Sequence, residues 1–401
     1  MRKDMPEFVL ACACCGWPLT DARLRAVRDA AASISDWDKF LRVVDRHRIA
    51  GLVHNALARA EVGVPQHIKA GLASRAQEIA AHNLLTASET IRLQRLFDEK
   101  EIPVLFVKGA TLAQLAYGSL SLKHALDIDF LVLPKHAQAA HTLLEDNGYA
   151  PLSGPLDDRQ RRALFHGATQ AGLVHKTTGL KIEMHWALME NPKLLAGVDA
   201  LSPTQAVFLS PGHGVRTLAN DDLFAYLCAH GAYHAWMRLK WLADLSAFIS
   251  SMPHPDIERL YRHADAKGAG LCAGQALLLC EELLGLALPA PLAQELHGSK
   301  RLLHLSDLAL DALIGKDGET EVMDRPFGTL RISFSHFLLG RGLRYGLAQW
   351  RTILMTPRDV IDYPLPSFLY FAYPVLRIPL HLWRLVVYRG RAAPFPDARN
   401  M

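Results

Sequence analysis

The spacing of apolar residues changes twice along the chain, and these changes constrain the fold more than any other feature of the sequence. From Asp21 to Lys100, apolar residues recur every three or four positions, which predicts helices. From Ile102 to Trp186, short apolar runs bounded by turn residues predict strands. Helical spacing returns beyond Asn220. The sequence therefore predicts an α+β protein in which a small sheet-containing unit is flanked by helical regions on both sides.

The central unit contains the predicted strands and a helix between the first two. The strands are expected at 104–107, at 128–133 and at both ends of 172–186, where a turn at 177–179 joins two strands, and the helix is expected at 111–117. Pro134 ends the second strand and begins a helix that reaches Asn147. Further upstream, Pro65 is placed to begin a long helix that runs to Phe97, because proline is tolerated in a first turn.

The length of the chain predicts more than one packed unit, since 401 residues exceed what one hydrophobic core usually organises. We expect a helical N-terminal region at 1–100, an α/β core at 101–218, a helical domain that completes a cleft at 219–345, and an apolar C-terminal helical segment at 346–401.

Charge and cysteine content narrow the class of protein. The formal charge of +4 falls well short of the concentrated basic face that duplex nucleic acid requires, so nucleic acid is not an expected partner, and small anionic substrates fit as well. Six cysteines are too sparse and too badly spaced for a disulfide framework, which favours a reducing compartment. Because the N-terminus shows no convincing signal peptide, we expect a cytoplasmic protein.

The C-terminal stretch 363–388 is strongly apolar and aromatic, but four prolines and several basic residues interrupt it. A helix that spans a membrane needs about 20 predominantly apolar residues in succession, so this stretch spans poorly. We expect it to dock onto the protein, with peripheral contact at the inner membrane face as the alternative.

Two aspartates at the start of the second predicted strand are the main candidates for chemistry. Asp127 and Asp129 alternate with Ile128, so both carboxylates point to one face of the strand. Their mutual repulsion is relieved when a hard divalent cation such as Mg²⁺ binds between them, although a strand end with two solvated aspartates is the competing interpretation. Upstream, Lys108-Gly109 closes a strand and opens a helix, which places a lysine and unpaired backbone amides where phosphate oxygens could bind.

The order of these residues resembles the DNA polymerase beta-like nucleotidyltransferases. Their signature is a glycine-containing turn from strand to helix, then Asp-x-Asp on the next strand, then a third carboxylate on a neighbouring strand. More closely, the chain is similar to a little-characterised bacterial group of nucleotidyltransferase family proteins. The matching residues are Lys108-Gly109, Tyr117-Gly118, Lys123, Asp127 to Val132 and Glu183-Met184-His185-Trp186. The similarity covers about Ile91 to Ile249 and departs from the usual residues at Ala110, Lys123 and Glu183.

The resemblance implies a small mixed-sheet nucleotidyltransferase core and a role for each matching residue. Asp127, Asp129 and Glu183 would be the catalytic residues and the ligands of Mg²⁺ or Mn²⁺, and Glu183 would also be the natural general base. Substrate and phosphate binding would fall to Lys108, Gly109, Lys123, His185, Arg238, Lys240 and Asp244. The donor would be a nucleoside triphosphate, and the acceptor an unidentified small molecule, peptide or protein.

Several alternatives stay open at this stage. Glu183 could be a solvent-facing strand residue, and the charged residues near 240 could form surface salt bridges. His230 and His234 lie four residues apart in a helix predicted from Asp221 to Trp236, where a substrate or packing role is more plausible than zinc binding. At the level of function, the alternatives are a noncatalytic nucleotide-binding or regulatory module and a transferase that uses a sugar-nucleotide donor.

Overall fold

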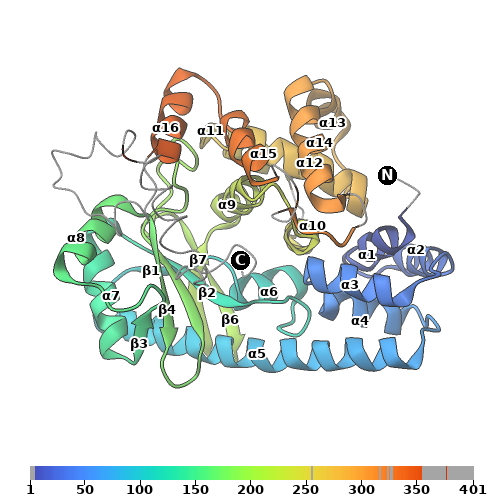
Figure 1. The fold of residues 1–401 in the computed structure, drawn as a ribbon, viewed down its shortest axis with the longest axis horizontal. Coiled ribbons are helices and arrows are strands. Elements are labelled where there is room, and N and C mark those ends of the chain that lie inside the picture. The colour runs from blue at the N-terminus through green and yellow to red at the C-terminus, as the bar shows by residue number, and fades with distance from the viewer. Residues whose placement is uncertain are drawn as a thin grey trace.

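The computed structural model describes residues 5–253, 256–315, 318–322, 325, 328–354 and 376. It confirms the predicted α+β architecture, with helices before and after a small mixed sheet (Figure 1). The N-terminal helices are α1 (Pro6–Cys14), α2 (Asp21–Ala31), α3 (Trp37–His47), α4 (Ala50–Arg59) and α5 (Gln66–Glu99). The central elements are β1 (Val104–Phe106), α6 (Ala110–Tyr117), β2 (Asp127–Val132), η1 (Pro134–His136), α7 (Ala137–Asp146), β3 (Tyr149–Pro151), α8 (Asp158–Gly167), β4 (Gln170–His175), β5 (Lys181–His185), β6 (Thr204–Ser210) and β7 (His213–Leu218). The later helices are α9 (Asn220–Tyr233), α10 (Leu239–Ser251), α11 (Ile257–Ala266), α12 (Gly270–Leu284), α13 (Ala290–His297), α14 (Lys300–Ile314), α15 (Gly328–Ser335), η3 (His336–Leu338) and α16 (Leu343–Leu354).

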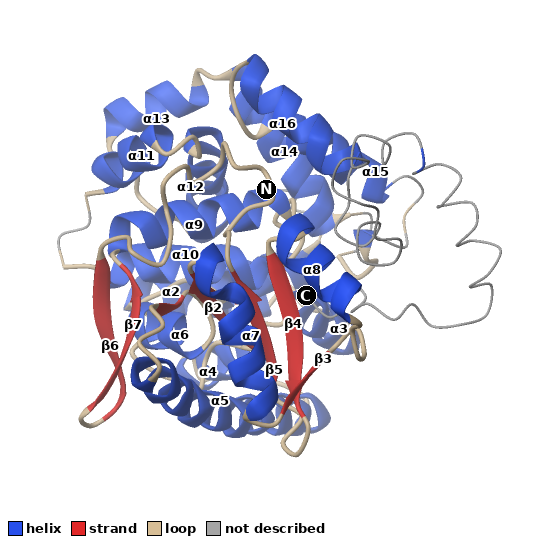
Figure 2. Cartoon of the chain, turned by 90° about the vertical axis from the view of Figure 1, so that its left-hand side faces the viewer, coloured by secondary structure: helices blue, strands red, loops and turns tan. Residues whose placement is uncertain are grey.

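Within the described residues, five strands form one mixed sheet in the order β1-β2-β5-β4-β3 (Figure 2). Strand β2 pairs antiparallel with β1 and parallel with β5, and β4 pairs antiparallel with both β5 and β3. The parallel register places Asp129 beside Glu183 and Leu131 beside His185. Strands from two separate parts of the sequence therefore present the predicted carboxylates next to each other.

The two faces of β2 pack into different hydrophobic cores. Ile128, Phe130 and Val132 join a core that includes the end of α5. Leu131 joins the other core, which contains residues of both the N-terminal and the later helices. Because side chains alternate along a strand, Asp127 and Asp129 share the face of Leu131. The predicted alternation is confirmed. It turns both aspartates toward the face of the sheet on which Leu131 packs against the N-terminal and the later helices.

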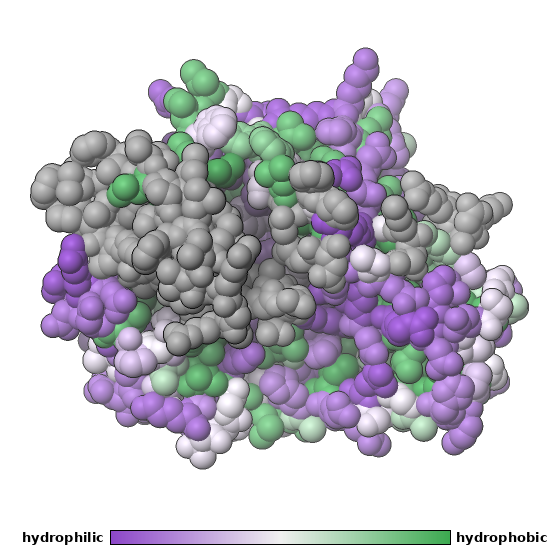
Figure 3. All heavy atoms as spheres, viewed as in Figure 1, coloured by the Kyte–Doolittle hydropathy of each residue, from purple (hydrophilic) through white to green (hydrophobic). Residues whose placement is uncertain are grey.

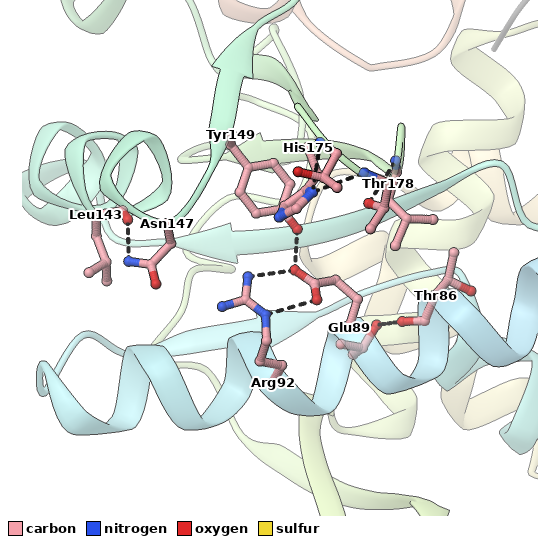
Figure 4. A network of polar contacts seen from close by, with 11 residues as sticks. Thr86, Glu89, Arg92, Leu143, Asn147, Tyr149, His175 and Thr178 are labelled. Carbon is pink, nitrogen blue, oxygen red and sulfur yellow. Dashed lines mark hydrogen bonds and ion pairs between the residues drawn. The ribbon is translucent and has the colours of Figure 1, made fainter.

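Helix α5 runs along the base of the molecule, beneath the N-terminal helices at one end and the sheet at the other (Figure 1). Its predicted start is confirmed, because Pro65 is the residue that caps the helix. Near the sheet, Glu89 pairs with Arg92 on the same helix and accepts a hydrogen bond from the Tyr149 hydroxyl of β3 (Figure 4). The Tyr149 ring meets His175 of β4 edge to face, with 5.0 Å between ring centroids. This network fixes the edge strand β3 to α5 and packs it against its neighbour β4.

Strands β6 and β7 form a separate antiparallel hairpin that the sequence analysis did not predict (Figure 2). Val207 and Val215 turn into the same core as Phe130, and β7 lies against β1 and α5. The hairpin extends the covered face of the sheet on the side of β1. Its turn at Pro211-Gly212, where Gly212 has a φ of +75°, was the available sequence signal.

The helix predicted from Asp221 to Trp236 ends earlier, at Tyr233. His234 follows it as the capping residue, and Ala235 and Trp236 adopt positive φ angles. The chain folds back here because the Trp236 ring packs directly onto Gly231, where a Cβ would lie 2.3 Å from the ring. The pattern of apolar residues does not reveal this packing, since Trp236 is as compatible with a further helical turn.

No helix within the described ranges is long and apolar enough to cross a membrane. Helix α16 carries exposed apolar side chains, among them Leu343, Leu347 and Trp350. Figure 3 shows apolar atoms at the top of the molecule, where Figure 1 places α16. The predicted docking of the segment 363–388 falls outside the described residues, apart from residue 376.

Candidate active site

A cavity of about 260 Å³ lies where the turn after β1 and the strands β2 and β5 face the helices α9 and α10. The residues on its wall that matter for chemistry are Lys108, Gly109, Lys123, His124, Asp127, Asp129, Glu183, His185, Tyr226, His230, Tyr233, His234, Lys240, Trp241 and Asp244. Every residue predicted for the site lies on this wall except Arg238. Sheet residues and helix residues that are far apart in sequence therefore share one enclosed space.

The turn between β1 and α6 depends on a glycine. Gly109 has φ +65° and ψ −131°, a conformation that residues with a side chain strongly disfavour. A Cβ on Gly109 would also lie 3.2 Å from the carbonyl oxygen of Asp127. The Thr111 hydroxyl donates to the carbonyl oxygen of Lys108 at 2.7 Å, which fixes the backbone on the other side of the glycine. The turn thus holds Lys108 and the N-terminus of α6 close to the start of β2.

Three side chains on the central strands form a potential metal-binding group. Asp129, Glu183 and His185 each offer one ligand atom, and these atoms lie within 4.8 Å of one another. The pairing of β2 with β5 sets the two carboxylates side by side, and the alternation along β5 adds His185. Asp127 lines the same cavity on the same face, outside this group. The resemblance implied Asp127, Asp129 and Glu183 as the metal ligands; the group that the structure brings within this distance has His185 in place of Asp127.

Lys108 supplies the counter-charge for these carboxylates. Its Nζ lies 2.8 Å from Oδ1 of Asp129; the Asp129 side chain is buried and that of Lys108 is 14% exposed. Burial raises the pKa of Asp129, but the charges of Lys108 and His185 outweigh burial and hold that pKa below its usual range. Burial likewise lowers the pKa of Lys108, yet Asp129 and the other acidic neighbours keep it well above the usual value. Lys108 and Asp129 therefore form a charged, buried pair.

Among the residues that the structure describes, no lysine or arginine pairs with Asp127 or Glu183 in this way. Burial and the neighbouring charge of Asp129 raise the pKa of Glu183 to about 8. The same two causes raise the pKa of Asp127. Lys108 thus offsets only part of the charge of these carboxylates, and an additional cation would stabilise their ionised form.

A second set of charges lines the cavity next to Asp127. Lys123 pairs with Asp244 at 2.6 Å, and Asp244 also accepts a hydrogen bond of 3.0 Å from the Tyr117 hydroxyl. Lys240 is buried nearby, and burial together with the charges of Lys123 and Arg48 lowers its pKa to about 7. The resemblance implied a substrate-binding role for Asp244; its observed partners are Lys123 and Tyr117.

Aromatic residues form the wall contributed by α9 and α10. The rings of His230 and His234 lie 4.6 Å apart, and Trp241 contacts both rings. Burial lowers the pKa of His234 to about 3 and lowers that of His230 well below its usual value, so both imidazoles are neutral. Tyr226 places its ring centroid 5.9 Å from Nζ of Lys108. This wall suits a planar ring or an apolar group beside the charged residues.

Sequence reasoning missed His124, Tyr233 and Trp241 as wall residues. His124 and Trp241 directly follow the predicted residues Lys123 and Lys240, and this adjacency was the available signal. Burial and the charge of Lys240 lower the pKa of His124 to about 3.

Arg238 lies away from the cavity wall. Its guanidinium donates to the carbonyl oxygen of Arg46 at 2.7 Å and to Glu321 at 2.5 Å. The side chain is buried, so its observed contacts join α3 to the residues after α14.

Comparison with known proteins places this geometry in a family. No curated protein matches the chain. The family described as "Uncharacterised nucleotidyltransferase" matches residues 33–285, which is well over half of the chain. The match includes α5, the five-stranded sheet, the hairpin and the helices α9 and α10, and therefore all the residues of the cavity wall named above. The chain belongs to this family of uncharacterised nucleotidyltransferases.

Proposed function

We propose that the protein is a metal-dependent nucleotidyltransferase that moves a nucleoside monophosphate from a nucleoside triphosphate to an unidentified acceptor and releases pyrophosphate. The observation that carries this proposal is the acidic group on β2 and β5, which faces a lysine and a glycine turn across one cavity. Family membership supports nucleotidyl transfer as the class of reaction. The acceptor is a small molecule, a peptide or a protein.

The residues present fit a divalent cation. Asp127, Asp129 and Glu183 offer the oxygen ligands that Mg²⁺ and Mn²⁺ accept. Burial and the negative charges of Asp129 and Asp127 raise the pKa of Glu183, and Lys108 offsets this only in part. A bound cation would relieve the remaining repulsion. When bound, the metal would neutralise charge on the phosphate oxygens of the donor.

The chain's own residues would bind the triphosphate and position it. Lys108 and Gly109 line the cavity beside the N-terminus of α6, where backbone amides suit an anion, and Lys123 and Lys240 add positive charge to the same wall. In-line transfer of a phosphoryl-type group depends on such positioning and charge and needs no protein nucleophile. Glu183 lines the cavity beside the other carboxylates, where it is placed to accept a proton from an acceptor hydroxyl or amine.

A donor screen tests the proposal directly. Purified protein is incubated with each of the four nucleoside triphosphates, with Mg²⁺ or Mn²⁺ and with lysate small molecules and proteins, and pyrophosphate and labelled products are followed by mass spectrometry. We expect metal-dependent pyrophosphate release that D127N and D129N reduce by about 100-fold or more, the size of loss typical of an electrostatic catalytic group. The control is D146N, since Asp146 is exposed at the end of α7.

Two outcomes would replace the proposal with its alternatives. Nucleotide binding without turnover on any acceptor would indicate a noncatalytic nucleotide-binding module. Transfer of a sugar from a nucleotide-sugar donor, with no transfer from a triphosphate, would indicate the other class of transferase. Equal labelling by wild type, D127N and D129N would remove these aspartates from the site.

We also propose that the protein contacts a membrane surface peripherally. The exposed apolar residues of α16 support it, as does the apolar composition of 363–388. Liposome flotation of the chain with and without residues 363–401 tests the part of 363–388, which equal flotation of the two forms would remove, and failure of both forms to float would remove the contact altogether.

A further inference from the structure

His185 has no hydrogen-bond partner for its ring among the residues that the structure describes. The residue ends β5, is 5% exposed, and shares the cavity face with Glu183. Neither Nδ1 nor Nε2 makes a hydrogen bond. A buried polar group without a partner costs about 1–3 kcal/mol, so such groups are rare unless a ligand or a water molecule completes them. The imidazole is therefore placed to bind something that enters the cavity.

The distances around His185 fit one metal ion. Nε2 lies 3.5 Å from Oδ1 of Asp129 and 3.8 Å from Oε2 of Glu183. Two ligands bound about 2.1 Å from one ion lie about 3–3.5 Å apart at the usual coordination angles. Only small shifts would bring the three side chains onto a common centre. A good hydrogen bond between His185 and either carboxylate would need a shorter distance than those observed.

The ammonium group of Lys108 lies beside Oδ1 of Asp129, which shows that a cation can occupy the space next to this oxygen. Its Nζ lies 2.8 Å from Oδ1 of Asp129, the oxygen that also faces His185. A cation bound at this oxygen would replace the ammonium group and leave Lys108 available to the phosphate groups of a donor. Among the described residues, no lysine or arginine pairs with Glu183. The negative charge of this carboxylate is therefore available to the metal ion.

We propose that His185 is a metal ligand through Nε2, together with Asp129 and Glu183, and that this nitrogen-containing site binds Mn²⁺ in preference to Mg²⁺. The inference rests on the proposed function only in taking the same carboxylates as metal ligands. Mg²⁺ prefers oxygen ligands and keeps several water molecules, whereas imidazole is a good ligand for transition-metal ions. The histidine would therefore set the choice of ion.

Pulsed EPR of Mn²⁺ bound to the full chain tests the inference without measuring activity. Direct coordination of the imidazole gives a ¹⁴N modulation in the spin-echo decay, and protein grown with ¹⁵N-histidine should replace it with the ¹⁵N pattern. In H185Q we expect the modulation to disappear and the Mn²⁺ dissociation constant to rise about 10- to 100-fold. The Mg²⁺ constant, measured by competition, should change much less.

The matched control is H124Q. His124 lines the same cavity but is surrounded by the cationic residues Lys123, Lys240 and Arg48, which disfavour a metal ion there. H124Q should keep both the modulation and the Mn²⁺ affinity. The labelling experiment needs no variant, so it shows whether a histidine coordinates the ion even if H185Q does not fold, and H185N then serves as the second variant that identifies the residue.

Three results would overturn the inference: bound Mn²⁺ without nitrogen modulation, modulation that persists in H185Q, or no Mn²⁺ binding up to about 10 mM. Its failure can be told apart from failure of the proposed function. Pyrophosphate release without nitrogen coordination removes only the role of His185. Nitrogen-coordinated Mn²⁺ without any transfer removes the enzymatic activity and leaves the metal site.

Discussion

At the scale of single residues, the pair between Lys108 and Asp129 holds the acidic group together in the absence of a metal. Asp129 is buried and Lys108 is largely so, and removal of the lysine would leave an uncompensated buried charge. We predict that K108M lowers the free energy of unfolding by about 3–5 kcal/mol and that Mn²⁺ restores part of this loss. Urea denaturation with and without Mn²⁺ measures both effects.

The control for this prediction is K135M, because Lys135 is exposed and its loss should change stability by less than about 0.5 kcal/mol. A K108M protein as stable as wild type would show that the buried carboxylates do not need Lys108. The same series would then point to protonation as the way in which the carboxylates avoid repulsion.

Glu183 gives the site a pH dependence whose sign follows from its raised pKa. Burial and Asp129 raise the pKa from the usual 4.5 to about 8 in the folded protein. Between these values the folded state binds the extra proton, so the contribution of Glu183 is most favourable below pH 4.5 and is lost as pH rises through about 8. We predict that E183Q is at least about 1.4 kcal/mol more stable than wild type at pH 8.5 and no more stable at pH 4.5.

Denaturation curves of the metal-free proteins at the two pH values test this prediction. E99Q removes the same charge at an exposed position of α5 and should show no such difference. If E183Q and wild type keep a constant difference across this range, the proton is not bound by Glu183.

At the scale of elements, the glycine turn between β1 and α6 is where backbone conformation and the site are coupled. Gly109 combines a positive φ with a ψ of −131° and lies close to Asp127, whereas Gly118 at the other end of α6 has φ +62° and ψ 17° with open space beside it. We predict that G109A costs about 1–3 kcal/mol and weakens Mn²⁺ binding. G118A should cost about 1 kcal/mol and leave Mn²⁺ binding unchanged, because the left-handed region is less strained.

Urea denaturation of the two variants measures the cost of backbone strain, and Mn²⁺ titration measures whether the turn still holds the site residues in place. Equal losses of stability in both variants, with Mn²⁺ binding intact in both, would contradict a specific role for the turn at Gly109.

The elements that the sequence predicted are those that local pattern alone determines. The alternation along the strand predicted that Asp127 and Asp129 share a face, and Pro65 predicted where α5 begins. The pair of Lys123 with Asp244 could not be predicted, because 121 residues separate the partners and nothing local links them. The prediction that Arg238 lines the cavity was wrong for the same reason, since its partners Arg46 and Glu321 are distant in the sequence.

At the scale of the whole molecule, the cavity has walls from two layers that share hydrophobic cores. The core on the site face of the sheet contains Leu131 from β2, Phe40 from α3 and Phe248 from α10. Neither helical region therefore packs on its own. The proposed metal site depends on this arrangement, because the lysine, the carboxylates and the aromatic wall come from different elements.

This shared core leads to a prediction for the isolated segment 101–218, the predicted α/β core. Without the helices, Leu105, Val107, Leu131 and Leu133 would lie exposed on the site face, and the opposite face would lose its packing against Phe97. Each such side chain loses about 1.5–3 kcal/mol of burial energy, so the four together lose about 6–12 kcal/mol, which is comparable to the whole 5–15 kcal/mol that stabilises a typical domain. We expect the segment to lack a fixed fold, with poorly dispersed amide signals in a ¹⁵N–¹H NMR spectrum, whereas the full chain should unfold in one cooperative step. A well-dispersed spectrum would show that the sheet is stable by itself, and the helices would then serve only to close the cavity.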